Sequence, residues 1–154
     1  MPAFERILCP VDFSEPAHLG LLTAVELARR FSAQLLIVHV VPPVPVAAVP
    51  EPVPVFDVLT YERELTKSAE KEIDRIIRDH VPGDVTSRSK ILDGDPAREI
   101  VGFAEAEKVD LIVMATHGES GWHRFVFGSV AEKVVRIAHC PVLTVPEPHG
   151  TPAE

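Results

Sequence analysis

The residues best suited to chemistry are a glycine–serine pair, Gly128–Ser129, that precedes a segment with helical periodicity. Glycine lets a ligand approach the backbone closely, and the first amides of a helix have no intrahelical partner. These amides lie at the positive end of the helix dipole, so they would suit an anion such as a phosphate. The same pair is also an ordinary helix cap, with Ser129 as the cap and Glu132 completing a capping box. Residue types and spacing are consistent with both a phosphate site and an ordinary helix cap.

An acidic residue, Asp12, follows the apolar run that ends at Val11. At the carboxyl end of a buried strand, its carboxylate would accept hydrogen bonds from ribose hydroxyls or hold a metal-bound water. The structural alternative is that Asp12 helps to cap a helix beginning near Ser14. Because Ser14 stands two residues after Asp12, the second aspartate of phosphatases with an aspartyl nucleophile is absent.

Several other chemistries lack their defining patterns. Neither GxGxxG nor GxxxxGK[ST] follows the first apolar run, which argues against dinucleotide and P-loop sites. The segment Gly118–Gly121 has Trp122 where a nucleophile elbow needs glycine. The seven histidines show no HExxH spacing, so no metal site built from protein ligands is expected. Cys9 and Cys140 lie among apolar residues without CxxC spacing, and we expect both to be buried thiols.

The elements that must position these residues are marked by apolar runs between turn signals. Four of them read as buried strands: Ile7–Val11, Leu35–Val41, Leu111–Ala115 and Val142–Val145. Their continuous apolarity is typical of a parallel sheet covered on both faces. A weaker strand, Val85–Leu92, alternates in polarity and is expected nearer an edge.

Segments with helical periodicity separate the strands, and three have start signals at Ser14, at Asp95 with Pro96, and at Ser129. The apolar residues that carry the periodicity are Leu21, Val25 and Ala28; Leu65, Ala69, Ile73 and Ile76; Ile100, Phe103 and Ala104; and Val130, Val134 and Ile137. The alternation predicts an α/β fold, with an open, mainly parallel five-stranded sheet and helices on both faces.

Ligands of such sheets gather beyond the carboxyl ends of the strands, where the strand order reverses. Three strand ends could meet there: Pro10–Ser14, His39–Val40, and Met114–Gly118 with its loop to Gly128–Ser129. The third is the most informative, because its loop returns into a helix start.

From Ile7 to Val145 the chain resembles the universal stress protein family. The resemblance is carried by ILCPVDFSE at 7–15, VHV at 38–40, GDPA at 94–97 and CPVL at 140–143. Its most specific part is a glycine loop. Nucleotide-binding members show Gly, two residues, Gly, nine residues, then Gly with Ser or Thr, and the corresponding positions here are Ala115, Gly118, Gly128 and Ser129.

The resemblance implies a Rossmann-like sheet of order 3-2-1-4-5 that binds ATP or another adenine nucleotide. Carried over by position, the nucleotide-binding residues are Pro10, Val11, Asp12, Val40, Met114, Ala115, Gly118, Gly128, Ser129 and Val130. Mg²⁺ or Mn²⁺ would reach the site through the phosphates, near Asp12. Ala115 departs from the glycine of the motif, and its added methyl group is expected to weaken binding without abolishing it.

The resulting hypothesis is a regulatory nucleotide-binding module of the stress response, with no dedicated catalytic role. One alternative is an interaction protein of the same fold that binds no nucleotide, and another is a slow ATPase. A homodimer through the last strand is expected, because an apolar edge strand needs covering and the family resemblance points the same way. The residues expected at that interface are Val142, Leu143 and Val145.

Charge and composition limit the partners. Fifteen basic residues against 23 acidic ones give a net charge of −8, which disfavours nucleic acid. No stretch approaches the roughly 20 apolar residues of a membrane span, and no export signal precedes the first strand, so a cytoplasmic location is expected.

The length of 154 residues suits a single compact domain, expected over residues 1–146. Within it, the proline-rich segment 42–54 is read as a stiff insertion after the second strand, with a lid or partner surface as the functional alternative. Residues 147–154 form a polar, proline-containing tail that is expected to fray.

Overall fold

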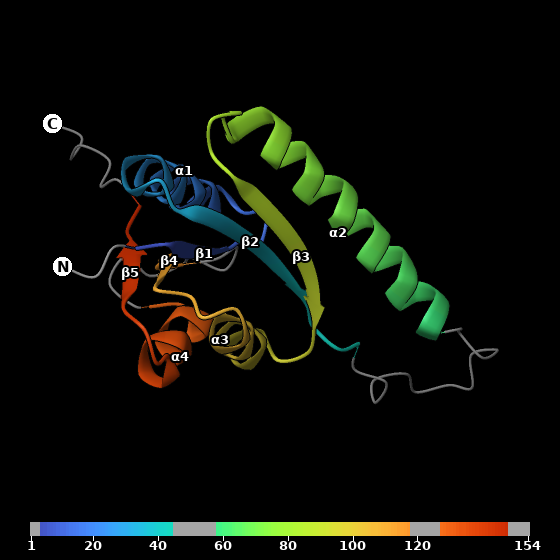
Figure 1. Ribbon diagram of the computed structural model, residues 1–154. Coiled ribbons are helices and arrows are strands. Elements are labelled where there is room, and N and C mark those ends of the chain that lie inside the picture. The colour runs from blue at the N-terminus through green and yellow to red at the C-terminus, as the bar shows by residue number, and fades with distance from the viewer. Residues whose placement is uncertain (1–3, 45–57, 118–126, 148–154) are drawn as a thin grey trace, which may run out of the picture.

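The computed structural model describes residues 4–44, 58–117 and 127–147. These residues form a parallel sheet with strand order β3-β2-β1-β4-β5 (Figure 1). The strands are β1 (Arg6–Pro10), β2 (Gln34–Val41), β3 (Ser87–Asp93), β4 (Leu111–Ala115) and β5 (Val142–Val145). The predicted α/β fold and strand order are confirmed. The weaker strand is an edge strand, as expected, and begins two residues later than its sequence pattern indicated.

Helices connect successive strands and cover both faces of the sheet, with α1 and α2 on one side and α3 and α4 on the other (Figure 1). Their bounds are α1 (Glu15–Phe31), α2 (Val58–His80), α3 (Pro96–Ala106) and α4 (Ser129–Ile137). Because successive side chains of a strand point to opposite faces, each strand contributes to two separate apolar clusters.

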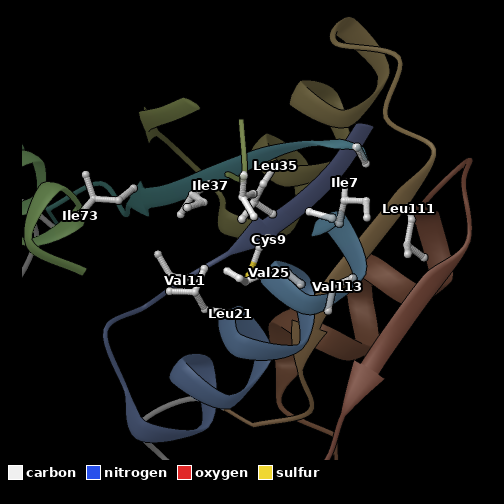
Figure 2. Close-up of a cluster of buried hydrophobic side chains, with 14 residues drawn as sticks. Ile7, Cys9, Val11, Leu21, Val25, Leu35, Ile37, Ile73, Leu111 and Val113 are labelled. Carbon is white, nitrogen blue, oxygen red and sulfur yellow. The ribbon is translucent and has the colours of Figure 1, made fainter. Parts of the chain in front are cut away.

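The cluster beneath α1 and α2 is shown in Figure 2. Strand residues such as Cys9 and Ile37 meet Leu21 and Val25 of α1 and Ile73 of α2 there. The opposite cluster joins Leu8, Val38, Ile112 and Met114 to the apolar faces of α3 and α4. The central strands are therefore buried on both faces, which explains their continuous apolarity.

Two of the predicted helix starts are confirmed. The Ser14 hydroxyl accepts a hydrogen bond from the Ala17 amide at 3.3 Å, and Asp95 accepts one from the Arg98 amide at 3.1 Å. Proline occupies the first turn of both α1 and α3, where its missing N–H costs no intrahelical bond.

The start of α4 differs from the expectation. Gly128 is the N-cap, Ser129 is the first helical residue, and no side chain of the described residues caps this end, so the predicted capping box is wrong. The cause lies across the loop: the Gly128 amide donates to the Thr116 carbonyl at 2.8 Å, which holds Gly128 in an extended conformation outside the helix. Glu132 pairs with Arg136 one turn later instead of folding back.

The strand order reverses between β1 and β4, because the chain builds β2 and β3 on one side of β1 and then returns to build β4 and β5 on the other. Helix α1 packs closely over the end of β4. A Cβ atom added at Gly20 would lie 3.2 Å from the Ala115 amide nitrogen, so a residue without a side chain permits this approach.

Candidate functional site

A cleft of about 480 Å³ opens at the carboxyl ends of β1, β2 and β4, within the range of roughly 300–1,000 Å³ common for small-molecule sites. It coincides with the reversal of strand order. Nine of the residues predicted from the sequence line it: Pro10, Val11, Asp12, Val40, Met114, Ala115, Gly128, Ser129 and Val130. The tenth, Gly118, lies outside the described residues.

The cleft also has lining residues that were not among the predicted site residues: Ala17, Val38, His39, Pro42, Pro96, Ile100, Thr116, His117 and Ala131. Thr116 and His117 directly follow β4, so their place after a strand end was a usable signal. Pro96 and Ile100 belong to α3, which packs against both α4 and β2. No sequence spacing reveals these contacts.

The turn after β1 holds Asp12 in a defined orientation. Its Oδ1 atom accepts hydrogen bonds from the Ser14 amide, at 3.1 Å, and from the Ser14 hydroxyl. Asp12 therefore supports Ser14, the residue that caps α1, as expected if Asp12 helps to cap this helix. Its side chain is nevertheless exposed and lines the cleft, and Oδ2 has no hydrogen-bond partner among the residues that the structure describes. One carboxylate oxygen thus remains available to a ligand.

The first turn of α4 contributes backbone donors. The Glu132 amide makes the first helical hydrogen bond, to the Gly128 carbonyl at 2.9 Å. The amides of Ser129, Val130 and Ala131 precede that bond, and no side chain in the described part of the chain caps them. These three residues all line the cleft, so the anion-binding end of the helix is part of the site.

Gly128 has φ −59° and ψ 150°, angles that any residue adopts. The backbone conformation alone therefore does not require glycine here. Among the properties of glycine, its small size is the one that matters to a ligand in the cleft.

Thr116 joins the loop ends to the sheet. Its amide donates to the Val145 carbonyl of β5 at 3.1 Å, and its carbonyl accepts the Gly128 amide. Its hydroxyl lies 2.8 Å from His117 Nδ1, while His117 Nε2 is buried and has no hydrogen-bond partner within the described ranges. Backbone hydrogen bonds therefore tie Thr116 both to β5 and to Gly128 at the start of α4.

No lysine or arginine lines the cleft in the described part of the chain, and Asp12 is its one acidic lining residue there. An ion pair joins α4 to the N-cap of α3: Lys133 donates to both carboxylate oxygens of Asp95, at 3.0 and 3.1 Å. The Lys133 hydrogen bond, supported by the Arg98 amide, holds the pKa of Asp95 below its usual range. Among the described residues, the groups that line the cleft and could contact an anion are therefore backbone amides.

The two cysteines lie away from this cleft and differ from each other. Cys9 is buried in β1, and burial raises the pKa of its thiol to about 12. Cys140 is partly exposed, so the expectation that both thiols are buried is wrong for it. It lies in the short connection between α4 and the edge strand β5, where fewer elements pack over it. Partial burial, and next the charge of Asp110, raise the pKa of Cys140.

Within the described ranges, no group of three histidine, cysteine or acidic residues is arranged to hold a metal ion. Likewise, no described helix combines the length and apolar character needed to cross a membrane.

Comparison with known proteins places this geometry in a family. The model of the universal stress protein family matches residues 3–146. The chain belongs to the universal stress protein family. Universal stress protein MJ0531 of Methanocaldococcus jannaschii is 34% identical over 145 residues, which cover 94% of this chain and 84% of that protein. The resemblance seen in the sequence motifs is thereby confirmed.

Solved structures of this family share the fold. The structure of protein MJ0577, from the same organism, aligns with a TM-score of 0.79 at 27% identity and covers 96% of this chain and 99% of that one. A universal stress protein from Archaeoglobus fulgidus, solved in complex with dAMP, aligns with a TM-score of 0.59 at 26% identity, covering 92% and 98% of the two chains.

Proposed function

We propose that this universal stress protein binds an adenine nucleotide, with ATP as the leading candidate, in the cleft at the carboxyl ends of β1 and β4. The observation that carries the proposal is that one cleft combines Asp12 Oδ2 with the first turn of α4, and that neither has a side-chain partner among the described residues. The Archaeoglobus fulgidus relative in complex with dAMP supports an adenine nucleotide as the ligand class.

The two polar features suit the ribose and the phosphates of a nucleotide. Oδ2 of Asp12 would accept hydrogen bonds from ribose hydroxyls, and the amides of Ser129, Val130 and Ala131 would donate to phosphate oxygens. Apolar side chains that line the same cleft, such as Val40 and Met114, would pack against the purine ring. The cleft volume of about 480 Å³ accommodates a ligand of this size.

A divalent cation, Mg²⁺ or Mn²⁺, would enter with the phosphates. As the alternative to its ribose contact, Oδ2 of Asp12 could add one protein ligand to the cation, since Mg²⁺ in nucleotide sites commonly uses one or two carboxylates besides phosphate oxygens and water. The chemistry that the cation supplies is neutralisation of phosphate charge, which matters here because the described lining lacks lysine and arginine.

We propose a regulatory role in the cytoplasmic stress response, in which the bound nucleotide changes the surface offered to protein partners. At most a slow ATPase activity is expected. The alternative, an interaction protein that acts without nucleotide as a homodimer, is favoured by one observation: Leu143 is 40% exposed on the edge strand β5. Val142, Leu143 and Val145 would form that interface.

The test combines native mass spectrometry of freshly purified protein with calorimetric titration of ATP, ADP, AMP and dAMP. Asp12→Asn keeps the size of the side chain but weakens its acceptor, so it should bind ATP less tightly than the parent. Asp84→Asn serves as the matched control, because Asp84 pairs with Arg29 on the surface and is not part of the cleft. A parent protein that carries no nucleotide and shows no binding to any of the four would refute the proposal.

Ala115 offers a second test of the same site. It lines the cleft at the end of β4, where the family motif has glycine. Ala115→Gly removes one methyl group from the site and should tighten ATP binding. Tighter binding in this variant would place the ligand against β4, whereas an unchanged affinity would show that the methyl group does not meet the nucleotide.

A further inference from the structure

We propose that His39, through its contacts with both chain neighbours of Asp12, positions the Asp12 carboxylate for its ligand. This inference rests on the proposed nucleotide function and deepens it. Val38 and Val40, on either side of His39 in β2, belong to the cluster beneath α3 and α4. His39 is among the residues that line the cleft, and its ring stacks on Phe13, which packs against the cluster beneath α1 and α2.

His39 contacts the residues immediately before and after Asp12. Its Nδ1 lies 2.8 Å from the Val11 carbonyl, which can only accept, so Nδ1 carries the proton and donates it. Its ring stacks on Phe13, with ring centroids 4.3 Å apart and an interplanar angle of 26°. Asp12 is therefore held between two anchor points that belong to one side chain.

These anchors matter because Phe13 has φ +64°, a left-handed conformation that is unfavourable for a bulky residue. Such a conformation persists only where its surroundings enforce it. It turns the chain back after Asp12, which allows Oδ1 to accept both the amide and the hydroxyl of Ser14. That leaves Oδ2 for a ligand.

Without the His39 contacts, Phe13 would relax toward negative φ, and Asp12 would lose its hydrogen bonds to Ser14. The carboxylate would then sample several orientations, and a nucleotide would have to order it on binding. We therefore expect that loss of the His39 contacts weakens nucleotide binding because it disorders the Asp12 carboxylate. This dependence distinguishes a positioning residue from one that only supports the fold.

The test uses the full chain and calorimetric titration with ATP. His39→Leu removes both anchors and should weaken binding about tenfold, comparable to the loss of one hydrogen bond to a charged group. His39→Asn keeps a donor near the Nδ1 position and should retain more affinity than His39→Leu. In an Asp12→Asn background, His39→Leu should cause little further loss. His139→Leu is the matched control, because its side chain is 75% exposed and contacts Glu105, far along the chain from this turn.

A second measurement needs no nucleotide. The Ser14 amide donates to Asp12, so its hydrogen exchange, followed by NMR, reports whether the turn is ordered. Exchange at Ser14 should be several-fold faster in His39→Leu and unchanged in His139→Leu. Hydrogen exchange at Ser14 tests the role of His39 independently of the proposed function. A parent protein that binds no nucleotide refutes the proposed function, while Ser14 exchange still tests the role of His39.

The positioning role is overturned if folded His39→Leu binds ATP as the parent does, if its effect persists in full in the Asp12→Asn background, or if Ser14 remains equally protected. If circular dichroism shows that His39→Leu does not fold, His39→Asn takes its place. Weaker binding with faster Ser14 exchange in that variant supports the role, and parent values of both overturn it.

Discussion

Replacing Gly128 by valine separates the binding function of the α4 start from its role in folding. The backbone angles at Gly128 are open to valine, and neither the bond from its amide to Thr116 nor the bond from Glu132 to its carbonyl requires glycine. The variant should therefore fold. Valine is a poorer N-cap than glycine, which costs about 1 kcal/mol of stability.

The effect on binding should be much larger. The added side chain would stand beside the amides of Ser129 and Val130, in the cleft where phosphate oxygens would approach. A hydrogen bond to a charged group contributes roughly 1.5–3 kcal/mol, so losing one weakens binding about tenfold to a hundredfold. Gly128→Val would block several such bonds and should exceed this range. Ser129→Ala removes at most one hydroxyl contact, and because this hydroxyl caps no amide among the described residues, stability should hardly change.

Calorimetric titration of ATP with Mg²⁺ into the parent, Gly128→Val and Ser129→Ala measures this order, with circular dichroism and urea unfolding as measures of the fold. Gly102→Val is the matched control. Gly102 lies on the exposed face of α3, and a Cβ atom there would meet nothing within 4 Å. A folded Gly128→Val protein that binds ATP like the parent would show that the phosphates lie elsewhere, and the nucleotide assignment built on α4 would fall.

Three further predictions concern the edge strand, the thiols and pH. Leu143→Asp should convert a dimer to a monomer in analytical ultracentrifugation without loss of secondary structure, and a folded variant that still dimerises would exclude β5 as the interface. With iodoacetamide at pH 8, Cys140 should be labelled before Cys9, whose buried thiol has a pKa of about 12; rapid labelling of Cys9 would contradict its burial. Because Lys133 lowers the folded-state pKa of Asp95, their pairing stabilises the protein above the ordinary value of 3.8 and is lost as the pH falls through the lower folded value. The urea midpoints of the parent and Asp95→Asn should therefore differ at pH 7 and converge in acid, and a constant difference would refute this.

Much of the fold follows from local physical chemistry in the sequence. Continuous apolar runs need cover on both faces, which indicates a parallel sheet, and Ser14 and Asp95 mark helix starts because their side chains accept first-turn amides. The motif spacing then places nine of the ten predicted site residues around one cleft. These features depend on residue type and short-range spacing, which a sequence displays directly.

Other features depend on contacts between distant segments. The cap of α4 moved from Ser129 to Gly128 because the Thr116 carbonyl, across a loop, holds the Gly128 amide. Cys140 has the apolar neighbours of a core residue, yet it lies beside an edge strand with one neighbouring strand.

The Asp12 carboxylate shows most clearly the difference between features that depend on local sequence and features that depend on distant contacts. Its position after a strand marked it as a candidate, but its orientation depends on a left-handed Phe13 and on His39 from a different strand. Residue types and spacing in the sequence indicate which residues could act and at which edge of the sheet they meet. Which atoms of the described residues lack a partner follows only from the folded contacts, because a hydrogen bond between distant segments leaves no periodicity or spacing in the chain.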